Sequence, residues 1–174
     1  MTKFIIVCGL TAAGKTTISD SLAKKLNIVC LHKDSIKESL YDIQSLKTLE
    51  DSRKIGHDSI QLLFKLVEEQ LKNGVDVIME GVFRHLEDVV LFKKWQKEYD
   101  LEVCTVVVEI DEDERNRRFL ERNKVRHLAH HDGGRVLNDG DIPFDYDKMP
   151  GEKINIVTDK LVEENIKIVL DKIN

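Results

Sequence analysis

The chain has 174 residues, of which 41% are hydrophobic and 34% charged, and its formal net charge is −5. These values predict one globular domain spanning residues 1–174, and they argue against wholesale disorder and against a general nucleic-acid-coating protein. No apolar run reaches the roughly 20 residues of a membrane span, and the first residues read as a strand rather than a signal peptide, so the sequence predicts a cytoplasmic protein with no membrane partner.

Apolar runs alternate with helical patterns along the chain. In chain order the predicted elements are a strand at 3–9, a helix at 15–26, a strand at 27–32, helices at 35–41 and 48–72, a strand at 75–81, a helix at 86–99, a strand at 101–110, a helix at 113–124, a strand at 153–158 and a helix at 159–173. The first strand is continuous and β-branched, as expected of a strand buried on both faces. This alternation predicts an α/β fold with helices on both faces of a parallel sheet.

Two of the predicted helices begin with a capping-box pattern. Ser35 is followed three residues later by Glu38, and Thr48 by Asp51. In such a box each side chain bonds a backbone N–H group at the other position, which marks a helix start. Because Ser35 would cap the short helix, the neighbouring Asp34 is predicted to point elsewhere.

Residues 127–150 break the alternation, because they are polar, contain three glycines and two prolines, and show no period. A loop of this length in a compact domain is typical of disorder or of a functional lid. Its position after a basic helix favours a lid over residues 125–150.

Histidines and cysteines raise the alternative of a metal site. His127, His130, His131 and Asp132 are close in sequence, but Gly133 follows directly and no distant carboxylate or cysteine completes a ligand set, so a polar lid is favoured. The cysteines are scattered singly on apolar stretches and are predicted to be core residues. They are Cys8, Cys30 and Cys104.

The segment after the first strand matches the phosphate-loop pattern in full, as Gly9-x-x-x-x-Gly14-Lys15-Thr16. The two glycines let backbone N–H groups turn inward, and the following helix offers its positive end to an anion. In this pattern the lysine reaches the β- and γ-phosphates and the threonine binds Mg²⁺, so ATP and Mg²⁺ are the predicted cofactors, with Thr16 as metal ligand. The predicted nucleotide contacts in the loop are Gly9, Leu10, Thr11, Ala12, Ala13, Gly14, Lys15, Thr16 and Thr17.

Two signatures of nucleotide hydrolysis are absent. A GTPase carries an Asn-Lys-x-Asp segment, whereas the nearest string here is NKVR at 123–126. A motor-type ATPase ends its third or fourth strand with four apolar residues and Asp-Glu, whereas these strands end DVIMEG and VVVEID. Their absence favours phosphoryl transfer over hydrolysis.

The phosphate loop, an Asp at the start of the second helix and an Arg-spaced helix before a lid together resemble a known group. The chain is similar to the small P-loop kinases related to nucleoside monophosphate kinases, most closely the branch with chloramphenicol phosphotransferase, zeta-type toxins and polynucleotide 5′-hydroxyl kinases. The resemblance implies a three-layer P-loop fold with a lid, whose five-stranded parallel sheet has the order 2-3-1-4-5. It also implies transfer of the γ-phosphoryl group of ATP to a hydroxyl group.

In that branch Asp-x-x-Arg follows the second strand, where the Asp accepts the proton of the acceptor hydroxyl and the Arg binds the acceptor. The corresponding residues here are Asp34 and Lys37, so the resemblance implies that Asp34 is the catalytic base and that both contact the acceptor. Phosphoryl transfer needs such a carboxylate to orient the nucleophile, although capping of the helix is the alternative role for Asp34. Lys37 lacks the bidentate grip of arginine, which leaves recognition of an acceptor phosphate open.

Further residues are candidates for the wall of the acceptor site. Glu80 follows the third strand and would contact the acceptor or help hold Mg²⁺ through water, and Arg84 would contact an anionic acceptor. An ordinary strand-to-helix turn is the alternative for both. Arg53 and His57 share a face of the long helix, where a surface pair is the favoured interpretation.

Arg118, Arg122 and Arg126 lie four residues apart and are predicted to share one helix face. In the kinases that the chain resembles, lid arginines stack on adenine or clamp the transferring phosphate. The resemblance thus implies catalytic roles for Arg118 and Arg122, an ATP contact for Arg118 and an acceptor contact for Arg126, against the alternative of a solvated charged helix. Thr158 and Asp159 follow the last strand, where relatives line the adenine site, and an N-cap of the last helix is the alternative.

These residues predict a kinase in which Asp34 is the base, while Lys15, Mg²⁺ on Thr16 and the lid arginines stabilise the transfer. The expected acceptor is a small molecule, a nucleotide, or the 5′ end of RNA or DNA. The rival hypothesis is a regulatory ATP-binding switch in which turnover is incidental. A monomer or weak dimer is expected.

Overall fold

The computed structural model describes residues 1–130 and 144–173. In these ranges the strands are β1 Thr2–Cys8, β2 Val29–His32, β3 Val77–Glu80, β4 Leu101–Glu109 and β5 Glu152–Val157. The helices are α1 Lys15–Leu26, α2 Lys33–Ile43, α3 Leu49–Lys72, α4 Leu86–Glu98, α5 Glu112–Asn123 and α6 Val162–Ile173, with 3-10 turns η1 Leu128–His130 and η2 Tyr146–Lys148. The predicted alternation of strands and helices is confirmed.

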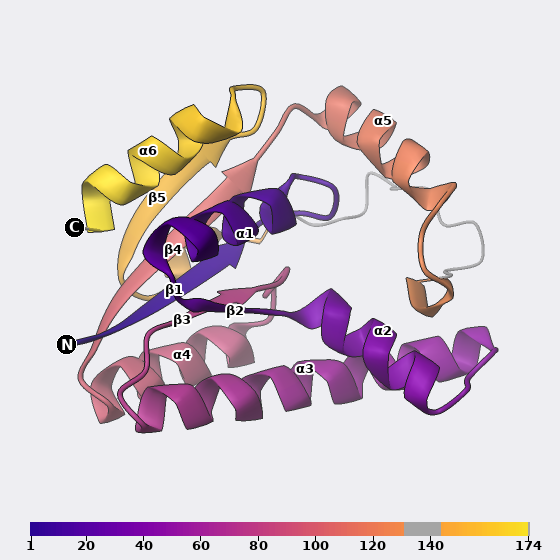
Figure 1. Cartoon of the computed structure of the whole chain (residues 1–174), viewed down its shortest axis with the longest axis horizontal. Helices are drawn as coiled ribbons and strands as arrows, with labels where there is room; N and C mark the ends of the chain where they lie inside the picture. The colour runs from indigo at the N-terminus through magenta and orange to yellow at the C-terminus, as the bar shows by residue number, and fades with distance from the viewer. Residues whose placement is uncertain (131–143, 174) are drawn as a thin grey trace.

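The strands form a parallel sheet in the order β2-β3-β1-β4-β5, which confirms the predicted topology. Helices α1 and α6 cover one face of the sheet, and α3 and α4 cover the other (Figure 1). In the sheet, Glu80 at the end of β3 lies between His32 of β2 and Val7 of β1. The carboxyl ends of three strands therefore meet at one edge, which is where ligands bind in open α/β folds.

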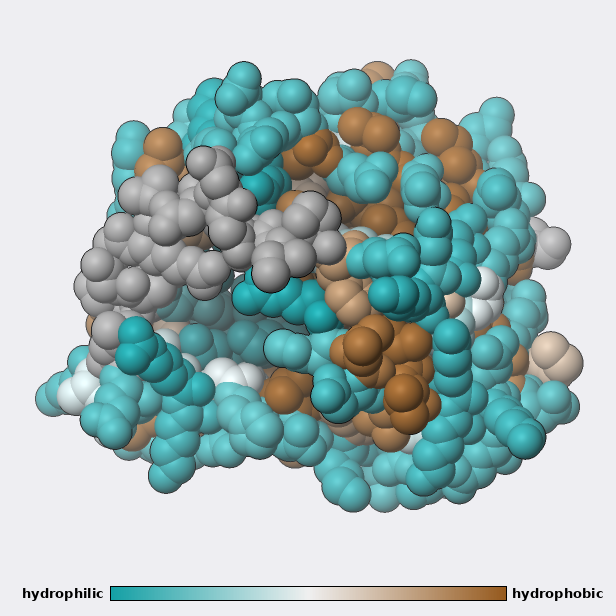
Figure 2. All heavy atoms as spheres, turned by 180° about the vertical axis from the view of Figure 1, so that it is seen from behind, coloured by the Kyte–Doolittle hydropathy of each residue, from teal (hydrophilic) through white to brown (hydrophobic). Residues whose placement is uncertain are grey.

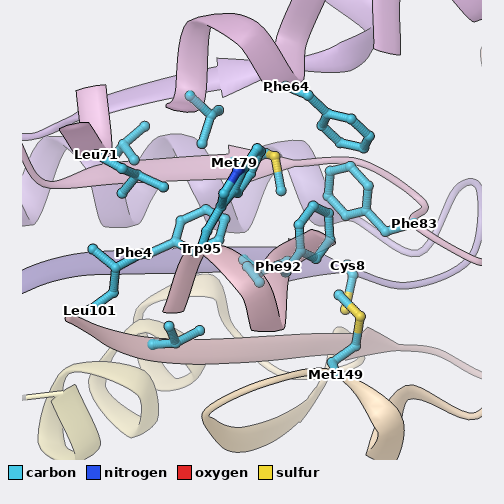
Figure 3. Packing of buried hydrophobic residues seen from close by; sticks show 14 of the residues in the cluster. Phe4, Cys8, Phe64, Leu71, Met79, Phe83, Phe92, Trp95, Leu101 and Met149 are labelled. Atoms are coloured by element: carbon cyan, nitrogen blue, oxygen red, sulfur yellow. The ribbon is translucent and has the colours of Figure 1, made fainter. Parts of the chain in front are cut away.

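Both faces of β1 are buried, which explains its continuous apolar sequence. On one face Phe4 packs against Phe92 and Trp95 of α4 (Figure 3). The ring centroids of Phe92 and Trp95 lie 5.7 Å apart. On the other face Ile5 packs in a cluster that includes Ile18 of α1. Fully burying side chains of this size contributes about 1.5–3 kcal/mol each, so these two layers hold the edge of the sheet in place.

Only one of the two predicted capping boxes forms. Thr48 Oγ1 accepts from the backbone N–H of Asp51 at 3.1 Å, and Asp51 Oδ2 accepts from that of Thr48 at 3.1 Å, which confirms the box at the start of α3. The predicted box of Ser35 and Glu38 is wrong, because α2 begins two residues before Ser35. Glu38 instead bonds a histidine of η1 at 2.9 Å, so a tertiary contact replaces the local one.

The last elements also differ in detail from the prediction. Helix α6 begins at Val162, so residues 159–161 belong to the preceding turn. Of the predicted lid, residues 131–143 lie outside the described residues. The part that follows them is attached to the body of the protein, because the Tyr146 hydroxyl donates to the carbonyl oxygen of Val82 at 2.9 Å. Among the described helices, none has the length and apolarity to cross a membrane.

Candidate functional site

The phosphate loop has a backbone that only glycine adopts easily. Gly9 has a φ of 138°, and a Cβ built on it would lie 2.2 Å from the carbonyl oxygen of Val108. Gly14 has a φ of 97° and caps the start of α1. Lys15 Nζ donates to the carbonyl oxygen of Leu10 at 2.9 Å, so the lysine reaches across the loop. The first turn of α1 has N–H groups without intrahelical partners, and this end of the helix is therefore suited to bind phosphate.

Glu80 lies beside Thr16, the residue that was predicted to bind Mg²⁺, and beside Lys15. Thr16 Oγ1 donates to Glu80 Oε2 at 3.3 Å, and Lys15 Nζ lies 4.0 Å from Glu80 Oε1. Burial lowers the pKa of Lys15, and the Glu80 carboxylate opposes that effect. A hydroxyl and a carboxylate are the oxygen ligands that Mg²⁺ prefers, with phosphate oxygens completing such sites, so these residues fit MgATP.

His32 also belongs to this group, although the sequence analysis did not identify it. Its Nδ1 lies 3.1 Å from Glu80 Oε2 and its Nε2 lies 3.0 Å from Asp20 Oδ1. Hydrogen bonds with the side chains of Cys30 and Glu80 raise the pKa of His32 to about 10. A signal was present in the sequence, because a histidine ends a strand two residues before the predicted base, but its partners lie on other elements.

Asp34 lies in the first turn of α2 and lines the same cavity as Lys15 and Glu80. Its Oδ1 lies 3.4 Å from Lys33 Nζ, and its Oδ2 lies 3.7 Å from Arg126 Nη2. Burial raises the pKa of Asp34, but the charges of Lys33, His130 and Arg126 outweigh it and hold the pKa below its ordinary value. The carboxylate is therefore ionised at neutral pH, as a proton acceptor must be.

These groups surround a cavity of about 760 Å³. Figure 2 shows the face opposite to that of Figure 1, with a hollow lined mainly by hydrophilic residues. The cavity is lined by residues of the phosphate loop and by Asp34, and also by apolar residues of α3 and of the turn after β3, among them Ile60 and Phe83. Its volume lies within the range of roughly 300–1,000 Å³ that is typical of small-molecule sites.

The prediction that the three arginines share one helix face is wrong, because α5 ends at Asn123 and Arg126 lies beyond it. Of the three, Arg122 and Arg126 line the cavity, and Arg118 does not. The Nε and Nη2 atoms of Arg122 are buried without a hydrogen-bond partner among the described residues. Arg118 donates to the hydroxyl and carbonyl oxygens of Thr158 at 3.2 and 3.0 Å, and Thr158 Oγ1 donates to the carbonyl oxygen of Ala13 at 2.7 Å. Arg118 is thus tied to the back of the phosphate loop. Asp159 is exposed in the next turn, and its contact with ATP stays a prediction.

The segment after α5 packs against α2, and Arg126 and His130 of this segment line the cavity. His130 Nε2 lies 2.9 Å from Glu38 Oε1, and His127 Nε2 lies 3.2 Å from Asp42 Oδ1. Ala129 is fully buried between them, against Tyr41 of α2 and a residue of α3. The start of the predicted lid therefore adjoins the helix that carries Asp34.

The alternative of a metal site at the lid histidines is not supported. His127 and His130 bond different carboxylates, and His131 and Asp132 lie outside the described residues. Within residues 1–130 and 144–173, no group of three or more His, Cys, Asp or Glu residues is placed to hold a metal ion. Cys8 and Cys104 are buried, and burial raises the pKa of the Cys104 thiol to about 12, in keeping with core residues.

Several cationic side chains line the cavity from α2, α3 and the turn after β3. Lys37 is buried and donates from Nζ to Ser52 Oγ at 3.0 Å. Arg84 lines the cavity from the turn after β3, and Arg53 and His57 line it from α3. Arg53 and His57 are exposed to solvent, as the interpretation of a surface pair requires, and both also border the cavity.

The chain is similar to curated proteins over a short segment only. Over 65 residues it is 40% identical to a tRNA dimethylallyltransferase of Onion yellows phytoplasma (strain OY-M), and 38% identical to one of Aster yellows witches'-broom phytoplasma (strain AYWB). Each match covers 36% of this chain and 22% of the relative's length. The chain thus matches about a fifth of these relatives.

Solved structures match over almost the whole chain. A candidate kinase of Chloroflexus aurantiacus J-10-fl has a TM-score of 0.77 at 22% identity and covers 99% of both chains. An APS kinase of Mycobacterium tuberculosis, crystallised with AMPPNP and APS, has a TM-score of 0.64 at 16% identity and covers 98% of this chain and 96% of its own. A shikimate kinase of Aquifex aeolicus has a TM-score of 0.52 at 20% identity, with 96% and 93% covered.

A family model described as an AAA domain, AAA_33, matches residues 4–137. The solved structures share the three-layer arrangement and thus establish the fold. Because the family model matches more than half of the chain, the protein belongs to this AAA-domain family, and its fold is that of the P-loop kinases.

Proposed function

We propose that the protein is a kinase that transfers the γ-phosphoryl group of ATP to a hydroxyl group of a small molecule, a nucleotide or a nucleic-acid end. The observation that carries the proposal is that Lys15, Asp34 and Arg122 line one cavity. A phosphate-binding lysine, an ionised carboxylate and a cation with unpaired donors are what phosphoryl transfer needs.

In the proposed reaction Asp34 accepts the proton of the acceptor hydroxyl, whose oxygen forms the new bond to the γ-phosphorus. The bond between that phosphorus and the bridging oxygen breaks, and ADP leaves with the bonding electrons. Lys15 and Arg122 neutralise the charge that develops on the phosphoryl and leaving oxygens. Thr16 and Glu80 would hold Mg²⁺, which supplies further positive charge to the phosphates when bound.

The lining of the cavity favours an acceptor with a negatively charged group. Lys37, Arg53 and Arg84 approach the cavity from α2, α3 and the turn after β3. The mycobacterial APS kinase that shares the fold was crystallised with AMPPNP and APS, so a second ligand beside the nucleotide is accommodated in that protein. Matched pairs of acceptors, such as a nucleoside and its monophosphate or a sugar and its phosphate, should therefore be included in a screen with labelled ATP.

Asp34→Asn tests the proposed base. We expect it to leave ATP binding unchanged and to lower the transfer rate about 10²–10⁴-fold, which is the usual contribution of such a base. Asp58→Asn is the matched control, because Asp58 is exposed on α3 and does not line the cavity. Transfer at the unsubstituted rate by Asp34→Asn would exclude the base role.

The rival function, an ATP-dependent switch, is supported by the contacts that join the start of the lid to α2. The start of the lid follows α5 and contacts α2, so ATP bound beside α5 would alter the surface that the start of the lid and α2 form together. A switch needs no base, so it predicts that Asp34→Asn keeps any nucleotide-dependent change in protease sensitivity and any slow ATP turnover. A kinase predicts that turnover depends on an acceptor and on Asp34.

A further inference from the structure

His32 is joined to two carboxylates that come from different elements. It is the last residue of β2 and lies beside Glu80, the last residue of β3, in the parallel register. Asp20 lies on α1, one turn after Thr16, so both face the same strand ends. Sheet order and helix spacing thus bring together residues that are far apart in the sequence.

Both ring nitrogens of His32 are used. Nδ1 lies 3.1 Å from Glu80 Oε2, and Nε2 lies 3.0 Å from Asp20 Oδ1. An ionised carboxylate only accepts hydrogen bonds, so Nδ1 bonds Glu80 as an N–H donor. The side chain of Glu80 is 7% exposed and that of Asp20 is 51% exposed, so the imidazole links an interior carboxylate to one at the surface.

We infer that His32 is a positioning residue that orients Glu80 for the metal ion of the bound nucleotide. Glu80 Oε2 receives hydrogen bonds from both His32 and Thr16, which leaves Oε1 on the side of Lys15 and the phosphate loop. A carboxylate held at one oxygen by two donors loses its freedom to rotate. Residues that orient a metal-binding carboxylate in this way typically contribute 10–100-fold to metal affinity. The inference rests on the proposed use of MgATP, because Glu80 acts only on a nucleotide-bound metal.

Two isosteric variants separate this role from simple packing. The amide N–H of asparagine replaces the Nδ1 donor, whereas that of glutamine replaces the Nε2 donor, so His32→Asn keeps the bond to Glu80 and His32→Gln keeps the contact with Asp20. Mn²⁺ binding in the presence of AMPPNP is measured by the loss of the free Mn²⁺ signal in electron paramagnetic resonance. Binding of AMPPNP without metal and the melting temperature are measured alongside.

For His32→Gln we expect Mn²⁺ affinity to fall about 10-fold or more, with metal-free AMPPNP binding unchanged. For His32→Asn we expect a change of less than about threefold, because the bond to Glu80 remains. Asp20→Ala should have an intermediate effect, since it removes only the outer link. The positioning role is overturned if the two His32 variants lower Mn²⁺ affinity equally. It is also overturned if they lower the melting temperature and leave Mn²⁺ affinity unchanged.

The result is independent of whether the protein is a kinase. If the unsubstituted protein transfers no phosphoryl group in the acceptor screen but shows the expected difference between the two His32 variants, the proposed function fails and the positioning of Glu80 stands. If Glu80→Gln binds Mn²⁺ and AMPPNP as tightly as the unsubstituted protein, the positioning role is overturned whatever the screen finds.

Discussion

Arg122→Ala should lower the transfer rate without a large loss of stability. Two guanidinium nitrogens of Arg122 are buried without a partner among the described residues, and each such group costs about 1–3 kcal/mol. Truncation removes that cost but also loses the packing of the aliphatic stem, which contributes about 1–2 kcal/mol. We therefore expect the free energy of unfolding without nucleotide to stay within about 1 kcal/mol of the unsubstituted value, or to rise.

The same substitution should lower the transfer rate by about 10³-fold or more, which is the effect of removing an arginine that stabilises transferring phosphate. Unfolding in urea can be followed by the fluorescence of Trp95, the single tryptophan, which is 2% exposed. Transfer is measured with labelled ATP and the acceptor that the screen identifies. A saturating nucleotide, at about 100 times its dissociation constant, should stabilise the unsubstituted protein by about 2.7 kcal/mol and the variant by less.

Arg117→Ala is the matched control for this prediction. Arg117 lies on the same helix, but its side chain is 56% exposed and pairs with Glu114 and Glu121 at 2.7 and 2.9 Å. Exposed ion pairs of this kind contribute about 0–1 kcal/mol, and we expect no change in transfer. The reasoning is refuted if Arg122→Ala loses more than about 2 kcal/mol of stability while it transfers at the unsubstituted rate.

Other substitutions test the loop, the core and the lid contact. Gly9→Ala places a Cβ 2.2 Å from a carbonyl oxygen of β4, at a φ of 138° that alanine rarely adopts. We therefore expect the variant to lose ATP binding in calorimetry, and an unchanged affinity for ATP would contradict this. Phe92→Ala should cost about 3–5 kcal/mol in urea unfolding, whereas Val90→Ala, on the exposed face of the same helix, should stay within about 0.5 kcal/mol. Burial lowers the pKa of His130, so its stabilising effect is complete above about pH 6.5 and is lost as the pH falls toward the folded-state pKa. His130→Gln should therefore show a shallower loss of stability between about pH 7 and 5, and an identical slope contradicts this.

The fold was predictable because its signals are local and repeated. Continuous apolar runs mark strands buried on both faces, and the phosphate loop marks the first turn of a P-loop fold. The capping box of Thr48 and Asp51 forms as predicted, because the two residues bond each other locally at the start of α3. The same pattern at Ser35 does not form a capping box, because Glu38 instead bonds a histidine 92 residues later in the chain.

The parts of the site that the sequence did not reveal depend on contacts between distant elements. In the sequence, His32 is an ordinary residue at the end of a strand. Its contact with Glu80, 48 residues later in the chain, becomes evident only when β2 and β3 are known to be neighbours in the sheet. Arg53 and His57 look like a surface pair because their helix face is polar, and only the packing of α3 beside the cavity shows what that face borders. Residue type and spacing predict which groups are suited to bind phosphate. The order of the strands in the sheet determines which other side chains lie beside those groups.

The strand register has a consequence for the chemistry of the site. Val7 and His32 both pair with Glu80, so the strand that leads to the phosphate loop, the carboxylate that we propose as a metal ligand and the strand that leads to Asp34 end at the same level of the sheet. A shift of β3 by one residue would move Glu80 by about 3.3 Å and turn its side chain to the other face of the sheet. The contacts of its carboxylate with Thr16 and the imidazole would then be lost together. The apolar residues of β3 that fix this register, which carry no reactive group, therefore determine whether the site can bind a metal-nucleotide complex.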